Sequence, residues 1–229
     1  MSVYLITGAS SDVGTALIDR LYREGDVFIA QGAGDLSHLA PLCRKYPGAI
    51  KTYDVDLTDP AALELFVHLP ALRVVNTRFK NFDEDRFERD MSVQIRSAVK
   101  LCKTFLPAMA KARQGRVLFM LTSYLLGAPP KNTAAYVMVK STLQGLAKSL
   151  AADYASFGVT VNCVMPSMME TKFLADTSDL IVQASAEANP MKRNARVEDV
   201  VPAMAFLLSE EAGFITGVTL PVTGGSAFL

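Results

Sequence analysis

The chain has 229 residues, of which 50% are hydrophobic, so it can bury a large core and fits one domain over residues 1–229 better than two. Its 23 lysines and arginines balance its 23 aspartates and glutamates, and the sparse cysteines and histidines lack the paired spacing of a metal site. Neither a basic leader nor a run of about 18 apolar residues indicates export or a membrane span. We therefore expect a cytoplasmic protein that binds a small molecule, with no metal and with neither nucleic acid nor membrane as a partner.

Short apolar runs alternate along the chain with amphipathic segments of helix length. The apolar runs predict strands at residues 3–6, 27–30, 50–53, 74–75, 117–121, 159–164 and 218–221. The amphipathic segments predict helices at residues 15–23, 87–112, 134–157 and 197–208. This alternation is typical of an α/β fold, a Rossmann-like doubly wound parallel sheet of about seven strands with helices on both faces. Residues 171–196 lack strand character, and we expect them to form a substrate loop or lid.

The first predicted strand leads directly into the turn Thr7-Gly8-Ala9-Ser10-Ser11-Asp12-Val13-Gly14, and a helix follows. Backbone N–H groups and the positive end of a helix can hold a pyrophosphate there, and glycine is needed wherever a side chain would block its approach. An ordinary tight turn is the alternative. The position of this turn between a strand and a helix favours dinucleotide binding.

Tyr136 and Lys140 are four residues apart, so they lie on one face of the predicted helix. An ammonium group beside a phenol favours the phenolate, which makes the phenolic proton available to a substrate oxygen. The pair alone is weak evidence, because a tyrosine that packs its ring beside a solvated lysine has the same spacing. Ser123 upstream and the glycine-rich turn favour hydride transfer on a nicotinamide cofactor.

Together these motifs resemble those of the short-chain dehydrogenase/reductase family, in order and spacing, over nearly the whole chain. The resemblance extends to Asp56-Leu57-Thr58-Asp59, to Asn162 through Ser167 with Thr171 beyond, and to Thr216-Gly217 and Gly224-Gly225. It implies an NAD(P)-dependent oxidoreductase that interconverts an alcohol and a carbonyl, with beta-ketoacyl reductase chemistry as one compatible subclass. It also implies a homodimer or homotetramer with the long helices at an interface.

The resemblance assigns roles to four catalytic residues. Tyr136 would exchange a proton with the substrate oxygen, and Ser123 would hold that oxygen. Lys140 would lower the pKa of Tyr136 and bond the nicotinamide ribose, and Gln94 would position a water that relays protons to Lys140. The cofactor-binding residues that it implies are Gly8, Ser10, Ser11, Asp12, Val13, Gly14, Gly32, Asp56, Leu57, Asn76, Tyr136, Lys140, Pro166, Ser167, Met169 and Thr171.

Several residues depart from the family pattern. Asp12 replaces the usual second glycine of the turn, where its charge would weaken cofactor binding or its side chain would cap the helix. The family's Asn-Asn-Ala-Gly becomes Asn76-Thr77-Arg78-Phe79, Gln94 replaces the catalytic asparagine, and Ser167 replaces a glycine. These changes leave a second hypothesis open, a catalytically impaired relative that serves as a cofactor-binding or scaffold protein.

The choice between NAD and NADP also stays open. Between Ala30 and Asp35 the sequence offers neither an arginine for a 2'-phosphate nor a well-placed acid for a 2'-hydroxyl. A sugar-nucleotide epimerase uses tyrosine and lysine at the same spacing, but it needs a C-terminal substrate domain for which this chain has no room. Phe173 and Leu174 suggest an apolar substrate pocket without naming its ligand.

Overall fold

The computed structural model describes residues 2–32, 34–54 and 68–228. Strands in these ranges are all paired in parallel and form two groups of three, which follow in chain order. The first group is β1 (Val3–Thr7), β2 (Val27–Gly32) and β3 (Ile50–Asp54), and the second is β4 (Gly115–Met120), β5 (Val159–Pro166) and β6 (Thr219–Val222). The predicted α/β class and parallel sheet are confirmed.

A single residue, His68, joins the two groups of strands. It forms parallel bridges with Thr7 of β1 and with Phe119 of β4, so the order across the sheet is β3-β2-β1-His68-β4-β5-β6. The strand that we predicted at residues 74–75 is wrong, because that segment has no regular structure. Two apolar residues do not suffice for a ladder, whereas the ring nitrogens of His68 find partners in Thr7 and in the Gln94 carbonyl.

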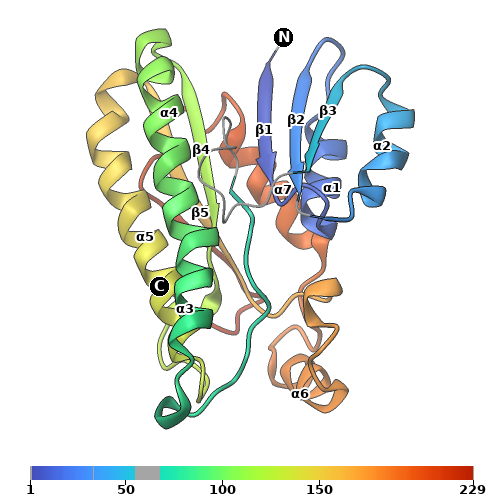
Figure 1. The fold of residues 1–229 in the computed structure, drawn as a ribbon, viewed down its shortest axis with the longest axis vertical. Helices are drawn as coiled ribbons and strands as arrows, with labels where there is room; N and C mark the ends of the chain where they lie inside the picture. Colours follow the sequence, from blue (N-terminus) through green and yellow to red (C-terminus); the bar gives the residue numbers. More distant parts are fainter. Residues whose placement is uncertain (1, 33, 55–67, 229) are drawn as a thin grey trace.

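Helices cover both faces of the sheet (Figure 1). One face carries α1 (Asp12–Leu21), α2 (Ala40–Lys45) and α7 (Val197–Leu208), and the other carries α3 (Glu84–Met91), α4 (Ser97–Ala112) and α5 (Ala134–Tyr154). The helix predicted at 87–112 is continuous from α3 to α4 through a π-helical turn, Ser92–Arg96. The predicted lid segment, 171–196, contains α6 (Asp179–Ala188). In the described ranges no helix is both long enough and apolar enough to cross a bilayer.

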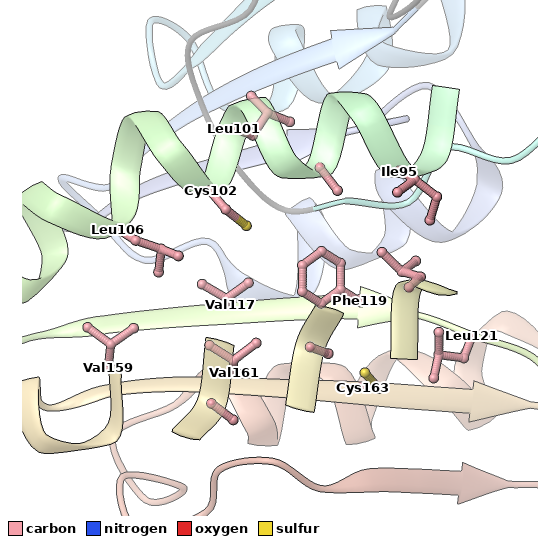
Figure 2. Packing of buried hydrophobic residues seen from close by; sticks show 14 of the residues in the cluster. Ile95, Leu101, Cys102, Leu106, Val117, Phe119, Leu121, Val159, Val161 and Cys163 are labelled. Atoms are coloured by element: carbon pink, nitrogen blue, oxygen red, sulfur yellow. The ribbon is translucent and has the colours of Figure 1, made fainter. Parts of the chain in front are cut away.

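The alternation of side chains along β4 divides the core in two. Val117 and Phe119 pack against α4 and α5 on one face, as Figure 2 shows for the α4 side, whereas Leu118 packs with Ile6 and Val200 on the other. Every residue of β5 is buried, as a central parallel strand requires. With both faces filled, the carboxyl ends of β1, β4 and β5 are fixed along one edge of the sheet, which is where doubly wound proteins bind ligands.

Candidate active site

A cavity of about 430 Å³ lies at this edge of the sheet. Its walls come from the glycine-rich turn, the end of β4, α5 and the segment that follows β5. The structure therefore brings together residues that are far apart in the sequence. The predicted site residues that line the cavity are Gly8, Ser10, Ser11, Asp12, Val13, Tyr136, Lys140, Pro166, Ser167, Met169 and Thr171.

The glycine-rich turn has the shape that a pyrophosphate needs. Gly8 adopts a positive φ of 67°, and a Cβ at Gly14 would lie 2.7 Å from the backbone of Ala9. Ser11 caps α1, since its Oγ accepts from the Gly14 N–H at 3.1 Å and donates to the Gly8 carbonyl at 2.7 Å. The turn therefore fits a dinucleotide phosphate at the start of α1.

Asp12 does not cap the helix, because Ser11 occupies the cap. Its carboxylate oxygen Oδ2 instead accepts the backbone N–H of Lys172 at 2.9 Å. Asp12 thus ties the glycine-rich turn to the first residues of the predicted lid. Its charge stays at the cavity wall, where a pyrophosphate would meet it.

Tyr136 and Lys140 share the α5 wall of the cavity. The Lys140 Nζ donates to the Met120 carbonyl at 2.9 Å and lies 5.8 Å from the centroid of the Tyr136 ring. Burial lowers the pKa of Lys140 to about 8, although the neighbouring Asp90 and Cys163 oppose this shift.

Burial raises the pKa of Tyr136, and the neighbouring Thr122 hydroxyl opposes this only in part. We expected Lys140 to lower the pKa of Tyr136. Its ammonium instead donates to the Met120 carbonyl, and desolvation dominates the titration of the phenol. Tyr136 therefore carries its proton at neutral pH, which is the form that can donate to a substrate oxygen.

Thr122, rather than Ser123, lines the cavity beside Tyr136. Thr122 is buried at the end of β4, whereas Ser123 is half-buried and opens a short 3-10 turn, Ser123–Leu125. Our sequence reasoning placed the oxygen-binding hydroxyl on Ser123 and missed Thr122 as a site residue. Two successive hydroxyl residues at a strand end were the available signal, because neighbouring side chains of an extended segment point to opposite sides.

Gln94 lies behind this wall, in the π-helical turn, and does not line the cavity. Its side chain is fully buried, and its Nε2 donates to Oδ1 of Asp90. Within the described part of the chain, its Oε1 has no hydrogen-bond partner. The π-helical turn that carries Gln94 contacts α5, the catalytic role of Gln94 stays a prediction, and Asp90 is a neighbour that sequence reasoning missed.

The other predicted cofactor residues are placed differently. A Cβ at Gly32 would lie 2.8 Å from Oγ of Ser10, so a glycine allows β2 to end against the turn. Asn76 is exposed and does not line the cavity, and Leu69 and Pro70 pack against Gly8 instead. The chain enters the sheet earlier, at His68, and the expected position of Asn76 beside the cofactor stays a prediction. Asp56 and Leu57 lie outside the described residues.

Comparisons with known proteins agree with this geometry. A family model described as enoyl-(acyl carrier protein) reductase matches residues 61–227. The chain is 31% identical over 238 residues to the 3-oxoacyl-(acyl-carrier-protein) reductase FabG of Escherichia coli (strain K12), which covers 97% of this chain and 96% of the relative. It is 26% identical to the acetoacetyl-CoA reductase of Allochromatium vinosum, with 97% of each chain covered.

Solved structures give the same result. A 3-oxoacyl (acyl-carrier-protein) reductase from Agrobacterium tumefaciens C58 with NADP bound superposes with a TM-score of 0.87 at 25% identity, covering 98% of this chain and 93% of that one. A structure from Beutenbergia cavernae with bound NADP has a TM-score of 0.88 at 25% identity, covering 98% and 96%. The chain belongs to the short-chain dehydrogenase/reductase family of NAD(P)-dependent oxidoreductases.

Proposed function

We propose that this protein reduces the 3-oxo group of an acyl thioester to a hydroxyl group. The observation that carries the proposal is the single cavity that Tyr136 and Thr122 share with Lys140 and the glycine-rich turn. The names of the similar reductases supply the substrate class. The lid residues Phe173 and Leu174 line the same cavity and offer an apolar surface to an acyl chain.

The residues of the cavity divide the chemistry among them. The glycine-rich turn would hold the pyrophosphate of NAD(P)H, which when bound would supply a hydride to the carbonyl carbon. As the carbon–oxygen double bond becomes a single bond, the Tyr136 O–H bond breaks and its proton passes to the carbonyl oxygen. The Thr122 hydroxyl, which lines the cavity together with Tyr136, would hold the same oxygen, the role that the resemblance gave to Ser123. Lys140 would stabilise the phenolate that remains.

The competing hypothesis is a family member that binds the cofactor without turnover. Asp12, Gln94 and the altered segment after Asn76 motivated it. Asp12 makes a defined bond to the lid, and Gln94 keeps a buried amide beside the catalytic helix. Both features suit a working site. The scaffold hypothesis predicts cofactor binding with no reduction of any ketone.

The test of the function is a reductase assay with acetoacetyl-CoA and either NADPH or NADH, followed by nicotinamide absorbance. We expect oxidation of one cofactor that depends on acetoacetyl-CoA, and at least tenfold less with a simple ketone of similar size that lacks the thioester. Cofactor binding by calorimetry without turnover would favour the scaffold hypothesis instead. Comparing the two cofactors in the same assay decides between NAD and NADP.

The remaining proposals concern organisation. We propose that residues 1–229 form one oxidoreductase domain whose segment 171–196 closes over the substrate, since its first residues already line the cavity. We also propose a homodimer or homotetramer. The partly exposed apolar side chains of Val99 on α4 and Met138 on α5 support a partner on that face. The cytoplasmic location stays a prediction.

A further inference from the structure

Asp90 is a buried carboxylate next to the catalytic helix. It lies near the end of α3, a helix rich in exposed charged residues, and it is 9% exposed. Its neighbours Glu88 and Arg89 are exposed. Burying a carboxylate costs several kcal/mol unless opposite charge or hydrogen bonds compensate, so its place inside the protein needs an explanation.

The immediate contact of Asp90 is with the predicted catalytic amide. Its Oδ1 accepts from Nε2 of Gln94, one turn further along. The turn between them is π-helical, and such turns are frequent at functional sites because they redirect side chains. With Nε2 held by Asp90, the buried Oε1 of Gln94 is left to accept a hydrogen bond from a water or another donor.

Asp90 also acts on both catalytic groups of α5. Its negative charge raises the pKa of Lys140 against the effect of burial, and it raises the pKa of Tyr136. Both α3 and the π-helical turn pack against α5, which places these groups within electrostatic reach of one another.

Among the described residues, four titratable groups buried in this region are neutral near pH 7, whereas the charged Asp12, Arg73 and Lys172 line the cavity together with Lys140. Burial lowers the pKa of His68 to about 3, so its imidazole is uncharged. Burial raises the pKa of the Cys163 thiol to about 12, and it also raises the pKa values of Tyr124 and Tyr136. Asp90 adds a buried carboxylate to this set, on a helix that packs against α5, and its charge opposes the effect of burial on the pKa of Lys140.

We propose that Asp90 is a positioning residue of the active site, whose buried carboxylate fixes the amide of Gln94 and places a negative charge against the catalytic helix α5. Asp90 does not line the cavity and acts through Gln94 and Lys140. The inference rests on the proposed reductase function. Removing the charge of Asp90 lowers the pKa values of both Lys140 and Tyr136. Reductase activity, which is lost at high pH, should therefore be lost at a lower pH than in the wild type.

The experiment compares the pH dependence of kcat and kcat/KM for acetoacetyl-CoA reduction in the wild type, Asp90→Asn and Asp85→Asn. Asp85 is an exposed carboxylate on the same helix, so its variant makes the same change in net charge. In Asp90→Asn we expect the alkaline limb to move to lower pH by on the order of one unit, with activity near pH 6 largely kept. In Asp85→Asn the limb stays in place. An unmoved limb in Asp90→Asn, or a loss of activity that is uniform across pH, would overturn the proposal.

A second readout does not require turnover. Reductive methylation, measured at Lys140 by mass spectrometry, modifies the uncharged amine, so its pH midpoint should fall in Asp90→Asn and not in Asp85→Asn. If the wild type does not reduce acetoacetyl-CoA but the methylation midpoint of Lys140 still falls in Asp90→Asn, only the reductase function is refuted. If the midpoint is the same in Asp90→Asn and in the wild type, the role of Asp90 is refuted. If Asp90→Asn folds poorly, Asp90→Ser, which also removes the carboxylate, is measured in its place. Failure of both variants to fold would show that the carboxylate serves the fold and would also overturn the proposal.

Discussion

Replacing His68 with glutamine should remove an acid-sensitive element from the centre of the sheet. His68 is 1% exposed, and its Nε2 lies 2.8 Å from the Gln94 carbonyl. Because a carbonyl only accepts, Nε2 carries the proton, and the Thr7 hydroxyl donates to Nδ1 at 3.3 Å. The folded protein therefore holds a neutral imidazole. Glutamine can supply a similar donor and acceptor without titrating.

The magnitude follows from the shifted pKa. An unfolded histidine titrates near its model value of 6.5, whereas burial lowers the folded pKa of His68 to about 3. For a histidine with a depressed folded pKa, the stabilisation is complete above pH 6.5 and is lost as the pH falls toward 3. Between pH 7.5 and pH 5 only the unfolded state takes up the proton, which costs about 2 kcal/mol, or 1.5 pH units at about 1.4 kcal/mol each.

The assay is urea denaturation at pH 7.5 and pH 5 at one protein concentration, for the wild type, His68→Gln and His38→Gln. Other groups contribute equally to all three proteins, so the difference between the two pH values isolates the histidine. His38, the second histidine of the chain, is exposed and serves as the control. We expect His68→Gln to lose about 2 kcal/mol less than the wild type on acidification. Equal losses in His68→Gln and wild type would refute a neutral buried His68.

Three further predictions concern the site and the assembly. Tyr136→Phe should lower kcat at least tenfold, or about 1.4 kcal/mol in activation free energy, because the proton donor is lost. Calorimetry should show an unchanged cofactor Kd. A smaller loss of kcat contradicts the assignment of Tyr136 as the proton donor. Asp12→Asn should tighten dinucleotide binding several-fold in calorimetry, since it removes a charge near the pyrophosphate but keeps an oxygen for the Lys172 N–H. Asp12→Gly also loses that oxygen, so its gain in dinucleotide affinity should be smaller. Equal Kd values in wild type and Asp12→Asn would mean that the charge of Asp12 does not act on the pyrophosphate. Sedimentation at micromolar concentration should show a dimer or tetramer, and a monomer would contradict the partner surface on α4 and α5.

The strands and the large helices could be predicted because their signal is local. The central strand β5 is buried along its whole length, and the predicted bounds lie within a few residues of the observed ones, as for β5 (Val159–Pro166) and α7 (Val197–Leu208). The strand prediction at 74–75 was wrong because it followed apolar residues. The residue that pairs with the neighbouring strands is His68, which is polar and is buried because its ring nitrogens find partners. The partners of His68 lie in β1 and in the π-helical turn, which only the folded chain brings together.

The site was predicted where its motifs are contiguous and missed where contacts join distant segments. The acidic side chain of Asp12 had two interpretations from its own turn, and the structure gives a third, a bond to Lys172. Asp90 stands in a run of charged residues that is typical of a solvated helix face. Its spacing to Phe87 and Gln94 was the available signal, because these three residues share one side of the helix and point to the core.

The missing strand and the altered catalytic amide have a common structural explanation. A buried polar chain runs from the Thr7 hydroxyl through the imidazole of His68 to the Gln94 carbonyl, and from the Gln94 amide to Asp90. Gln94 lies in the π-helical turn, and its carbonyl accepts from His68. His68, which joins the two groups of strands, thus also holds the π-helical turn that carries Gln94. This turn packs against α5, the helix of Lys140. A change at His68 should therefore affect the free energy of unfolding and the geometry of the active site together, even though His68 does not line the cavity.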